Sequence, residues 1–443
     1  MSSVRYWVNW AGNVSSQPTS YHEPTTEDEI VSLVKSIANV GERIKVVGSG
    51  HSCSRIAASN GVHLVSLVRY NKVLEIKSEA CTVTVQAGIT LKQINNFIEH
   101  HGLVLSNIGT ISEQTIAGAI STGTHGTGIN FGGISQQVTA LTMVCANGEV
   151  ISLSKEQEPE FFAAALVSLG CLGIISTVTI SCESAFNLRW LGSPATLDYA
   201  LEHLEELNQS EHFAFWWFPH TNYVYLMSSN RTAQPIDPPK NAIVVWFKDV
   251  ILGNYLHEVA LWLSVHVPGI VPTINQCFRY LFFSSQRERI ALSYQIFNLT
   301  ILLRQYVMEY AIPIENTATA IRKLRDLINE AKFKVHFPIE VRFSAKDDAW
   351  LSLSYGRETC FIGVIIYRPF GQEIPYDNYF QQVDALMISL EGRPHWGKIH
   401  YQSTNHFRKL YPKWDEFLTI RNSLDPKSMF INDYLERIFF DES

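Results

Sequence analysis

Apolar residues recur at helical spacing over residues 25–41, so this segment predicts an amphipathic helix. Thr26 and Glu29 form a capping-box pattern at its start, and Gly41 stands where helices commonly end. The β-branched run at 44–47 that follows favours a strand. The chain therefore opens with a helix followed by a strand.

The rest of the first 185 residues mixes strand-like and helical patterns. Thr90 and Gln93 cap a second helical pattern, which ends at Gly102. Asn147-Gly148 lies between two apolar runs and predicts a hairpin turn. Strands are predicted at 62–68, 81–87, 138–146, 149–153 and 174–182, and a further helix at 159–169.

The pattern changes at about residue 186. Aromatic residues and leucine are dense and turn signals irregular up to about residue 300. Regular patterns return at Asn316, which we expect to cap a helix. Strands are then predicted at 335–343 and 360–367, and a helix at 378–390.

Residues 259–278 contain no Asp, Glu, Lys or Arg and are long enough to span a bilayer. Pro268, Gly269 and Pro272 interrupt the run, which favours a buried segment of a folded domain. An attachment that lies in the membrane interface stays open as the alternative.

Composition narrows the class of protein. The chain has 443 residues, of which 46% are hydrophobic and 17% charged, and this length favours more than one domain. A net charge of −7 without a block of Lys or Arg argues against a nucleic-acid partner. Seven scattered cysteines without a CxxC pair indicate free intracellular thiols and no metal site, and the N-terminus shows no secretory signal.

Two loops rich in glycine, serine and threonine carry the clearest functional signal. The predicted strand at 44–47 runs into Gly48-Ser49-Gly50-His51-Ser52, and residues 121–128 read Ser-Thr-Gly-Thr-His-Gly-Thr-Gly. Glycine lets the backbone approach a ligand closely, and successive N–H groups bind pyrophosphate. A nicotinamide-dinucleotide fingerprint is rejected, because the third glycine and the following helix are missing. We expect a large phosphate-bearing cofactor held from two sides.

Three further motifs are candidates for a binding site. Glu340 and Arg342 share one face of a predicted strand, where they form either a surface ion pair or the wall of a pocket. The loop 394–398 combines a histidine, an aromatic ring and a lysine beside a glycine, as binding edges do. The aromatic strip 216–220 is either a cavity wall or a core strand. Local pattern alone leaves all three open.

Together and in this order, the motifs resemble those of the aldonolactone oxidoreductases of the vanillyl-alcohol-oxidase flavoprotein superfamily. The similarity includes Trp217-Phe218-Pro219-His220, Tyr367-Arg368-Pro369 and Asp425-Pro426, covers essentially the whole chain, and is closest to the members that oxidise L-gulono-1,4-lactone. It implies an α+β fold. A PCMH-type FAD-binding domain would cover 1–185, an α/β substrate-binding cap domain 186–415, and a segment returning to the FAD domain 416–443.

The resemblance implies FAD as the cofactor, bonded covalently through its 8α-methyl group to the ring of His51. Cys53 replaces the proline expected two positions after this histidine, which bears on the stiffness of the loop and not on the linkage. The implied cofactor-binding residues are Val47, Gly48, Ser49, Gly50, His51, Ser52, Gly109, Thr110, Ser112, Gly118, Ser121, Gly123, Thr124, His125, Gly128 and Ile174.

The resemblance also implies hydride transfer from a substrate carbinol to flavin N5. Glu340 would anchor hydroxyl groups, while Arg342 and Lys398 would stabilise the developing alkoxide. The general base stays open between Lys398 with a lowered pKa and a histidine. Gly109 matches the position that admits oxygen to the flavin. Further candidates for the substrate pocket are His395, Trp217 and Arg368.

The implied reaction oxidises an aldono-1,4-lactone, foremost L-gulono-1,4-lactone, with O₂ to the 2-keto lactone and H₂O₂. The keto lactone then tautomerises to L-ascorbate. Alternatives are the same chemistry on L-galactono- or D-arabinono-1,4-lactone or an alditol such as xylitol, and a catalytically silent FAD-binding or membrane-tethered protein. The expected location is intracellular, at the endoplasmic reticulum membrane if the protein follows its animal relatives and cytoplasmic otherwise.

Overall fold

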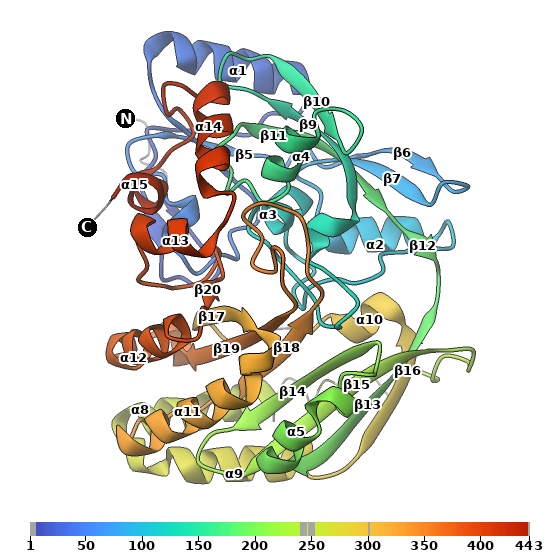
Figure 1. Cartoon of the computed structure of the whole chain (residues 1–443), viewed down its shortest axis with the longest axis vertical. Coiled ribbons are helices and arrows are strands. Elements are labelled where there is room, and N and C mark those ends of the chain that lie inside the picture. Colours follow the sequence, from blue (N-terminus) through green and yellow to red (C-terminus); the bar gives the residue numbers. More distant parts are fainter. Residues whose placement is uncertain (1–5, 240–245, 247–252, 300–301, 442–443) are drawn as a thin grey trace.

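The chain folds into two halves, each built on its own sheets (Figure 1). The computed structural model describes residues 6–239, 246, 253–299 and 302–441. One half combines elements from both ends of the chain, and the other is built around an eight-stranded sheet from its middle.

Two larger sheets form the N-terminal half. A parallel sheet has the order β3-β5-β4, and an antiparallel sheet has the order β10-β9-β11-β7-β6. Most of the predicted strands are confirmed, and the hairpin at Asn147-Gly148 joins β9 to β10 as predicted. The bounds are β3 (Ser20–His22), β4 (Ile44–Val47), β5 (His63–Ser66), β6 (Val73–Lys77), β7 (Thr82–Gln86), β9 (Val138–Val144), β10 (Val150–Ser154) and β11 (Ile174–Ser181), with short pairs β1–β2 (Trp7–Val8, Ser15–Ser16) and β8–β12 (Leu103–Val104, Glu183–Ser184).

The helices of this half begin and end largely as their capping residues predict. Thr26 accepts a hydrogen bond from the backbone N–H of Glu29 at the start of α1, and Gly41 ends it in the left-handed conformation. The predicted helix 159–169 ends early, at Ala165, and Leu169 and Gly170, which both have positive φ angles, turn the chain just beyond it. The bounds are α1 (Glu27–Val40), α2 (Leu91–Glu99), α3 (Ile116–Ser121) and α4 (Pro159–Ala165).

The C-terminal helices complete the core of the N-terminal half. They are α13 (Thr404–Leu410), α14 (Trp414–Leu424) and α15 (Asp433–Phe440). Trp396, Trp414 and Phe439 belong to the same buried cluster as Leu105 and Ile120. Trp350 and Leu351 belong to it as well, so packing against this core is not confined to 416–443, and the domain division itself stays a prediction.

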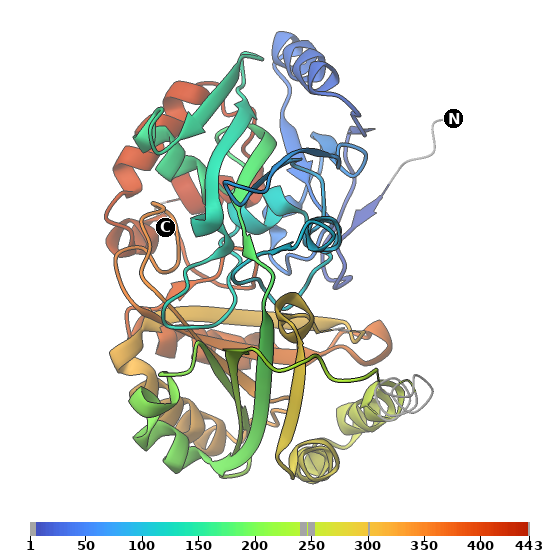
Figure 2. The ribbon, with the colours of Figure 1, turned by 90° about the vertical axis from the view of Figure 1, so that its right-hand side faces the viewer.

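The second half is one antiparallel sheet with helices on both faces (Figure 2). Its order is β16-β13-β15-β14-β18-β19-β17-β20. The strands are β13 (Asn187–Thr196), β14 (His212–Phe218), β15 (Tyr223–Thr232), β16 (Arg287–Leu292), β17 (Gln305–Pro313), β18 (Ile339–Ser344), β19 (Thr359–Tyr367) and β20 (Arg393–Pro394). The helices are α5 (Leu197–Glu202), α6 (Leu204–Leu207), α8 (His257–His266), α9 (Val271–Phe283), α10 (Ser293–Phe297), α11 (Thr317–Glu330) and α12 (Asp377–Ile388).

Two predictions for this half differ from the structure. The strand predicted at 335–343 begins only at Ile339, because the backbone N–H of Val335 bonds to the ring of His220 and not to a neighbouring strand. Asn316 makes no capping bond from its side chain, because its backbone is already helical (φ −84°, ψ −2°) and it ends a preceding helical turn.

The two faces of the eight-stranded sheet have different partners. Residues such as Met308, Ile339 and Trp217 point into a closed core together with α5, α11 and α12. Since side chains alternate along a strand, their neighbours point to the opposite face, which α8 and α9 partly cover. The candidate site lies on this second face.

Helices α8 and α9 contain the long apolar run of the sequence. In the described part of the chain, no helix is long and apolar enough to cross a membrane. Leu261 and Val271 are buried, as predicted for this run, but Val259, Leu263 and Leu281 are exposed. The prediction of a buried segment is therefore only partly confirmed.

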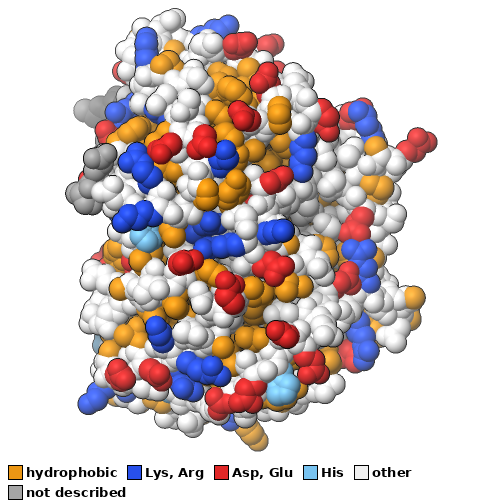
Figure 3. Space-filling view, in the orientation of Figure 1, with side chains coloured by type: hydrophobic (Ala, Val, Ile, Leu, Met, Phe, Trp, Pro, Cys, Tyr) orange, Lys and Arg blue, Asp and Glu red, His pale blue; other side chains and the backbone are white. Residues whose placement is uncertain are grey.

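Charged side chains of both signs share the face drawn in Figure 3. Lys and Arg gather along the seam between the two halves, and acidic side chains lie beside them. This face does not carry the extended basic surface that nucleic-acid binding requires.

Candidate active site

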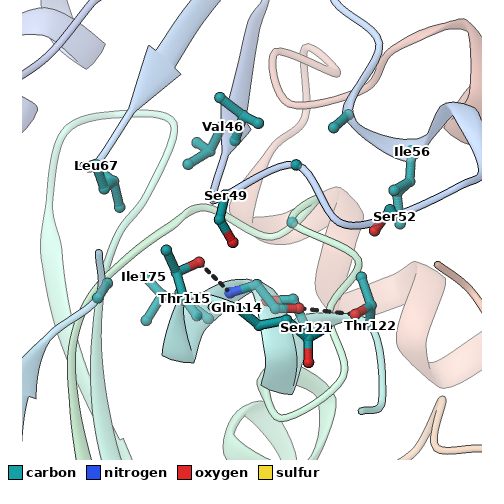
Figure 4. Close-up of a pocket in the computed structure, with 18 of the residues that line it drawn as sticks. Val46, Ser49, Ser52, Ile56, Leu67, Gln114, Thr115, Ser121, Thr122 and Ile175 are labelled. Atoms are coloured by element: carbon teal, nitrogen blue, oxygen red, sulfur yellow. Dashed lines mark hydrogen bonds between the residues drawn. The ribbon is translucent and has the colours of Figure 1, made fainter. Parts of the chain in front are cut away.

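The first glycine loop lies in a cleft that α3 and β11 line from the other side (Figure 4). A side chain at residue 48 would bring its Cβ within 2.2 Å of Thr115 Oγ1, and Gly50 has a φ of +72°, so both positions require glycine. Figure 4 shows the Ser49 side chain pointing into the cleft. The loop thus brings backbone close to whatever the cleft holds.

Side-chain hydrogen bonds drawn in Figure 4 close helix α3 at both ends. Thr115 Oγ1 accepts from the N–H of Gly118 at 3.4 Å, and Thr122 Oγ1 donates to the carbonyl of Gly118 at 2.9 Å. The cleft brings together nine of the sequence-predicted cofactor residues, namely Val47, Gly48, Ser49, Gly50, His51, Ser52, Gly118, Ser121 and Ile174.

A second, more polar cavity continues from this cleft toward the eight-stranded sheet. The two share His51, Ser52, Gln114 and Thr122. The predicted residues that line the second cavity are Gly109, Thr110, Thr124, His125, Arg342, His395 and Lys398. Candidate cofactor and substrate residues from both halves therefore meet in one place.

His51 lies where the two cavities join. Its Nδ1 atom is buried and has no hydrogen-bond partner in the described part of the chain, while Trp10 stacks on the ring at 5.5 Å between centroids. Burial lowers the pKa of His51, the charge of Glu113 raises it and that of Lys398 lowers it further. The imidazole is neutral at pH 7, with an unused ring nitrogen available to a ligand.

Glu340 and Arg342 line a pocket, which decides between the two readings that local pattern left open. Arg342 Nη2 lies 3.1 Å from Glu340 Oε2 and 2.8 Å from Glu309 Oε1. The indole N–H of Trp216 donates to Glu340 at 3.2 Å. Arg342 Nε is buried and unpaired among the described residues, so this guanidinium has a donor left for a ligand.

Sequence reasoning missed Glu309. This carboxylate is 3% exposed in the fully buried strand β17, and its Oε1 lies 3.5 Å from His125 Nε2. Burial alone would raise the pKa of Glu309, but Arg342 and His125 hold it well below its usual range. The sequence did contain one indication of this residue, a single acidic side chain within an otherwise apolar strand. A buried charge requires a partner, so such a residue points to a charged or polar site.

The two buried histidines beside Glu309 hold opposite tautomers. His125 Nδ1 contacts the carbonyl of Gly126 at 2.9 Å and so carries a proton, which leaves Nε2 as the acceptor. His395 Nδ1 accepts from the N–H of Gly397 at 3.0 Å, so its proton is on Nε2. Burial lowers the pKa of His125, and it lowers the pKa of His395 to about 3.

His125, Glu309 and His395 have the composition of a metal site, and their ligand atoms lie within 4.8 Å of one another. Arg342 already places a positive charge 2.8 Å from Glu309, which disfavours a cation there. The group is better described as a buried charge network, and the expectation of no metal stays a prediction.

Trp217 does not line the pocket. Trp216 pairs with Glu340 across β14 and β18, so Trp216 shares its face and Trp217 points to the other side. Trp217 is 1% exposed in the core behind the sheet, and its indole N–H donates to the carbonyl of Thr221. Of the two readings of this strip, the core strand holds for Trp217 and the cavity wall for Trp216.

Four other predicted residues lie outside the cavities. Arg368 donates to the carbonyls of Ala11 at 2.6 Å and Gly371 at 3.0 Å, so it has a structural role where a substrate contact was predicted. The other three predicted cofactor residues shape the surrounding loops: Ser112 bonds to the side chain of Glu113, Gly123 allows a positive φ next to Leu353, and Gly128 bridges to Ser344.

Comparison with known proteins places the chain in a family. The profile "D-arabinono-1,4-lactone oxidase" matches residues 178–438, and the profile "FAD binding domain" matches residues 18–154. The chain belongs to the D-arabinono-1,4-lactone oxidase family. This confirms the family resemblance and the FAD-binding domain that the sequence motifs implied.

Individual relatives extend over nearly the whole chain. An L-gulonolactone oxidase of Scyliorhinus torazame is 41% identical over 98% of this chain and 98% of its own. An L-gulono-1,4-lactone dehydrogenase of Mycobacterium tuberculosis is 36% identical over 98% of both chains. The crystal structure of cholesterol oxidase from B. sterolicum has a TM-score of 0.80 at 18% identity over 98% of this chain and 97% of its own, and therefore shares the fold.

Proposed function

We propose that the protein oxidises aldono-1,4-lactones with FAD and O₂, with L-gulono-1,4-lactone as the main substrate. The products would be H₂O₂ and the 2-keto lactone, which tautomerises to L-ascorbate. The observation that carries the proposal is that Arg342 and Lys398 line two cavities at once. One of these holds the two glycine-loop histidines, and the other is lined by Glu340. The names of the relatives above support the same chemistry.

The cleft fits FAD. Its glycines leave room for a diphosphate, and His51 Nδ1 is a buried, neutral ring nitrogen that lacks a partner among the described residues. We assign the covalent attachment to this atom, at the flavin 8α-methyl group. Bound FAD supplies the two-electron acceptor for a carbinol held at the inner end of the pocket.

The substrate would be oriented by charge. Arg342 and Lys398 line the same cavity and would stabilise the alkoxide that forms as the hydroxyl loses its proton. Glu340, fixed by the indole N–H of Trp216 and by Arg342, would accept hydrogen bonds from the remaining hydroxyl groups.

We assign the proton acceptor to His125 Nε2. The carbonyl of Gly126 fixes the tautomer that leaves this nitrogen unprotonated. Glu309, 3.5 Å away, would stabilise the imidazolium that proton uptake creates. His395 is a poorer base, because the Gly397 N–H occupies the acceptor nitrogen of its ring.

Peroxide release on a panel of substrates tests the function. The panel contains L-gulono-, L-galactono- and D-arabinono-1,4-lactone and xylitol. The proposal expects the highest kcat/KM with L-gulono-1,4-lactone. A higher value for another compound reassigns the substrate, and no turnover on any of them, with flavin bound, identifies a silent flavoprotein.

Activity should fall in acid as His125 becomes charged. Burial places the pKa of His125 below 6.5, so the imidazole is neutral at pH 7 and gains a proton as the pH falls through that pKa. We expect kcat/KM to be constant near neutrality and to drop below that pKa. His125→Gln should lower kcat by about 10²–10⁴ and remove the acid limb. An unchanged acid limb in His125→Gln would rule out this base.

Oxygen access is tested at Gly109. A Cβ at this position would lie 2.8 Å from Thr124 Cγ2, so Gly109→Ala is combined with Thr124→Ser, which keeps the hydroxyl that Gln114 contacts. We expect reoxidation by O₂ to slow by roughly tenfold or more, a barrier of about 1.4 kcal/mol, while dye reduction is retained. Thr124→Ser alone is the control. Equal loss with O₂ and dye would contradict the gate.

We further propose a peripheral membrane contact at α8 and α9, in an intracellular compartment. Val259, Leu263, Tyr280 and Leu281 are 43–68% exposed, and apolar side chains on a helical surface support interfacial binding. Free thiols at all seven cysteines support a reducing compartment. Flotation with phospholipid vesicles tests the contact, which Leu263→Glu should weaken.

A further inference from the structure

One cavity beside the site extends well beyond the catalytic groups. It has a volume of about 790 Å³ and lies between the eight-stranded sheet and helix α9. Its inner end is polar, with Thr110, Glu309, Glu340, Arg342 and Lys398. Its remaining part is defined here as the outer chamber.

The outer chamber is walled mainly by rings and aliphatic side chains. Phe278, Phe282 and Phe283 come from α9, Ile365 from β19, and Phe337 and Leu303 from the segments before β18 and β17. Leu299 and Leu302 also line the cavity and are 48% and 49% exposed, so they form an apolar rim at its opening. The chamber therefore connects the catalytic groups to the surface through mainly apolar walls, although Arg289, Asn298 and Gln305 also belong to the lining of the cavity.

The outer chamber is too large and too apolar to be a binding site for a sugar lactone alone. Pockets of about 300–1,000 Å³ enclose drug-sized ligands, and a six-carbon lactone is much smaller than these. The lactone's hydroxyl groups need hydrogen-bond partners, and the inner end supplies them. Water gains little in a space walled by phenylalanine, so the chamber favours an apolar occupant.

We infer that the outer chamber binds the apolar tail of an amphiphilic ligand whose polyhydroxy lactone head occupies the inner end. The carbinol that reacts lies next to the lactone carbonyl, so the primary hydroxyl at the other end of the molecule is free to carry a substituent. The ligand class is thus an aldonolactone esterified at its primary hydroxyl with a medium-length acyl chain. The inference rests on the proposed function only for the placement of the head.

Calorimetry with a non-reacting probe tests the inference. The 6-O-octanoyl ester of the 2-deoxy lactone lacks the reacting hydroxyl, so the holoenzyme binds it without turnover. We expect a Kd at least about tenfold below that of the unesterified 2-deoxy lactone, since the chain leaves water for an apolar chamber. Equal Kd values would overturn the inference, as would octanoate alone binding as tightly as the ester.

Neighbouring residues on α9 supply a matched pair of variants. Phe282 lines the chamber, whereas Leu281 is 64% exposed and does not. The gain is the ratio of the Kd of the unesterified lactone to the Kd of its ester. Phe282→Ser should reduce this ratio to about one, and Leu281→Ser should leave it unchanged. Ile365→Trp, which fills the chamber, should abolish the gain while unesterified lactone still binds; a gain that survives both chamber variants would overturn the inference.

The same measurements separate this inference from the proposed function. If L-gulono-1,4-lactone is oxidised but the ester gains nothing, the chamber inference fails and the function stands. If no lactone is oxidised and the ester still binds more tightly through Phe282, the function fails and the chamber inference stands.

Discussion

Replacing Arg342 with methionine is expected to slow anaerobic flavin reduction by L-gulono-1,4-lactone by about 10²–10³, because the developing alkoxide loses a charged donor. Arg342 is held between Glu309 and Glu340 and has a buried Nε without a partner among the described residues. Stopped-flow bleaching of the flavin measures the step directly. Arg342→Lys should restore part of the rate, since it keeps the charge but loses the planar fork of donors.

Loss of folding must be separated from loss of chemistry. Arg342→Met leaves the carboxylate of Glu309 buried beside a neutral His125, and an uncompensated buried charge costs about 3–5 kcal/mol. Arg342→Met combined with Glu309→Gln removes that charge and should recover thermal stability without recovering the rate. A double variant with wild-type reduction rate would show that Arg342 does not act on the reacting atoms.

Replacing His51 with alanine is expected to release all FAD into the supernatant on acid precipitation, whereas the parent protein keeps its yellow colour in the pellet. The physical reason is that His51 Nδ1 is the buried nitrogen assigned to the flavin 8α-methyl group. The bond withdraws electron density from the ring, so the variant should also have a lower flavin reduction potential. Mass spectrometry of the denatured chain gives a second, independent reading.

His125→Gln is the matched control for the linkage, because His125 lies in the other glycine loop and lines only the second cavity. It should retain covalent FAD. Flavin that stays with the His51→Ala chain after denaturation would place the bond elsewhere, and Cys53 would then be the residue to test by mass.

The sequence predicted those parts of the site that depend on residues close together in the chain, and it missed those that depend on distant residues. Local signals succeeded: the β-strand alternation placed Glu340 and Arg342 on one face, and the glycines at 48 and 50 marked the cleft. The prediction that Trp217 lines the pocket was wrong by one residue. Only the pairing of Trp216 with Glu340 fixes which indole faces the pocket. That register is set by contacts 124 residues apart and has no local pattern.

Long-range charge pairing explains the larger omission. Glu309 is a site residue because it pairs with Arg342 and His125. Arg342 comes from another strand, and His125 comes from the other half of the fold. The sequence around it reads only as an apolar strand. Trp396 and Leu351 also pack in the core of the N-terminal half, and no local periodicity assigns either residue to that core.

The shared core of the N-terminal half has a consequence for biosynthesis. The backbone N–H of Ile44, at the head of the strand that leads to His51, donates to the carbonyl of Met429, and the amide of Asn432 donates to the carbonyls of Ile56 and Ala58. These partners are synthesised several hundred residues after the loop that they support. The dinucleotide cradle therefore gains these contacts only once residues 429–432 have been made, so we expect chains that stop before Met429 to hold the prosthetic group poorly.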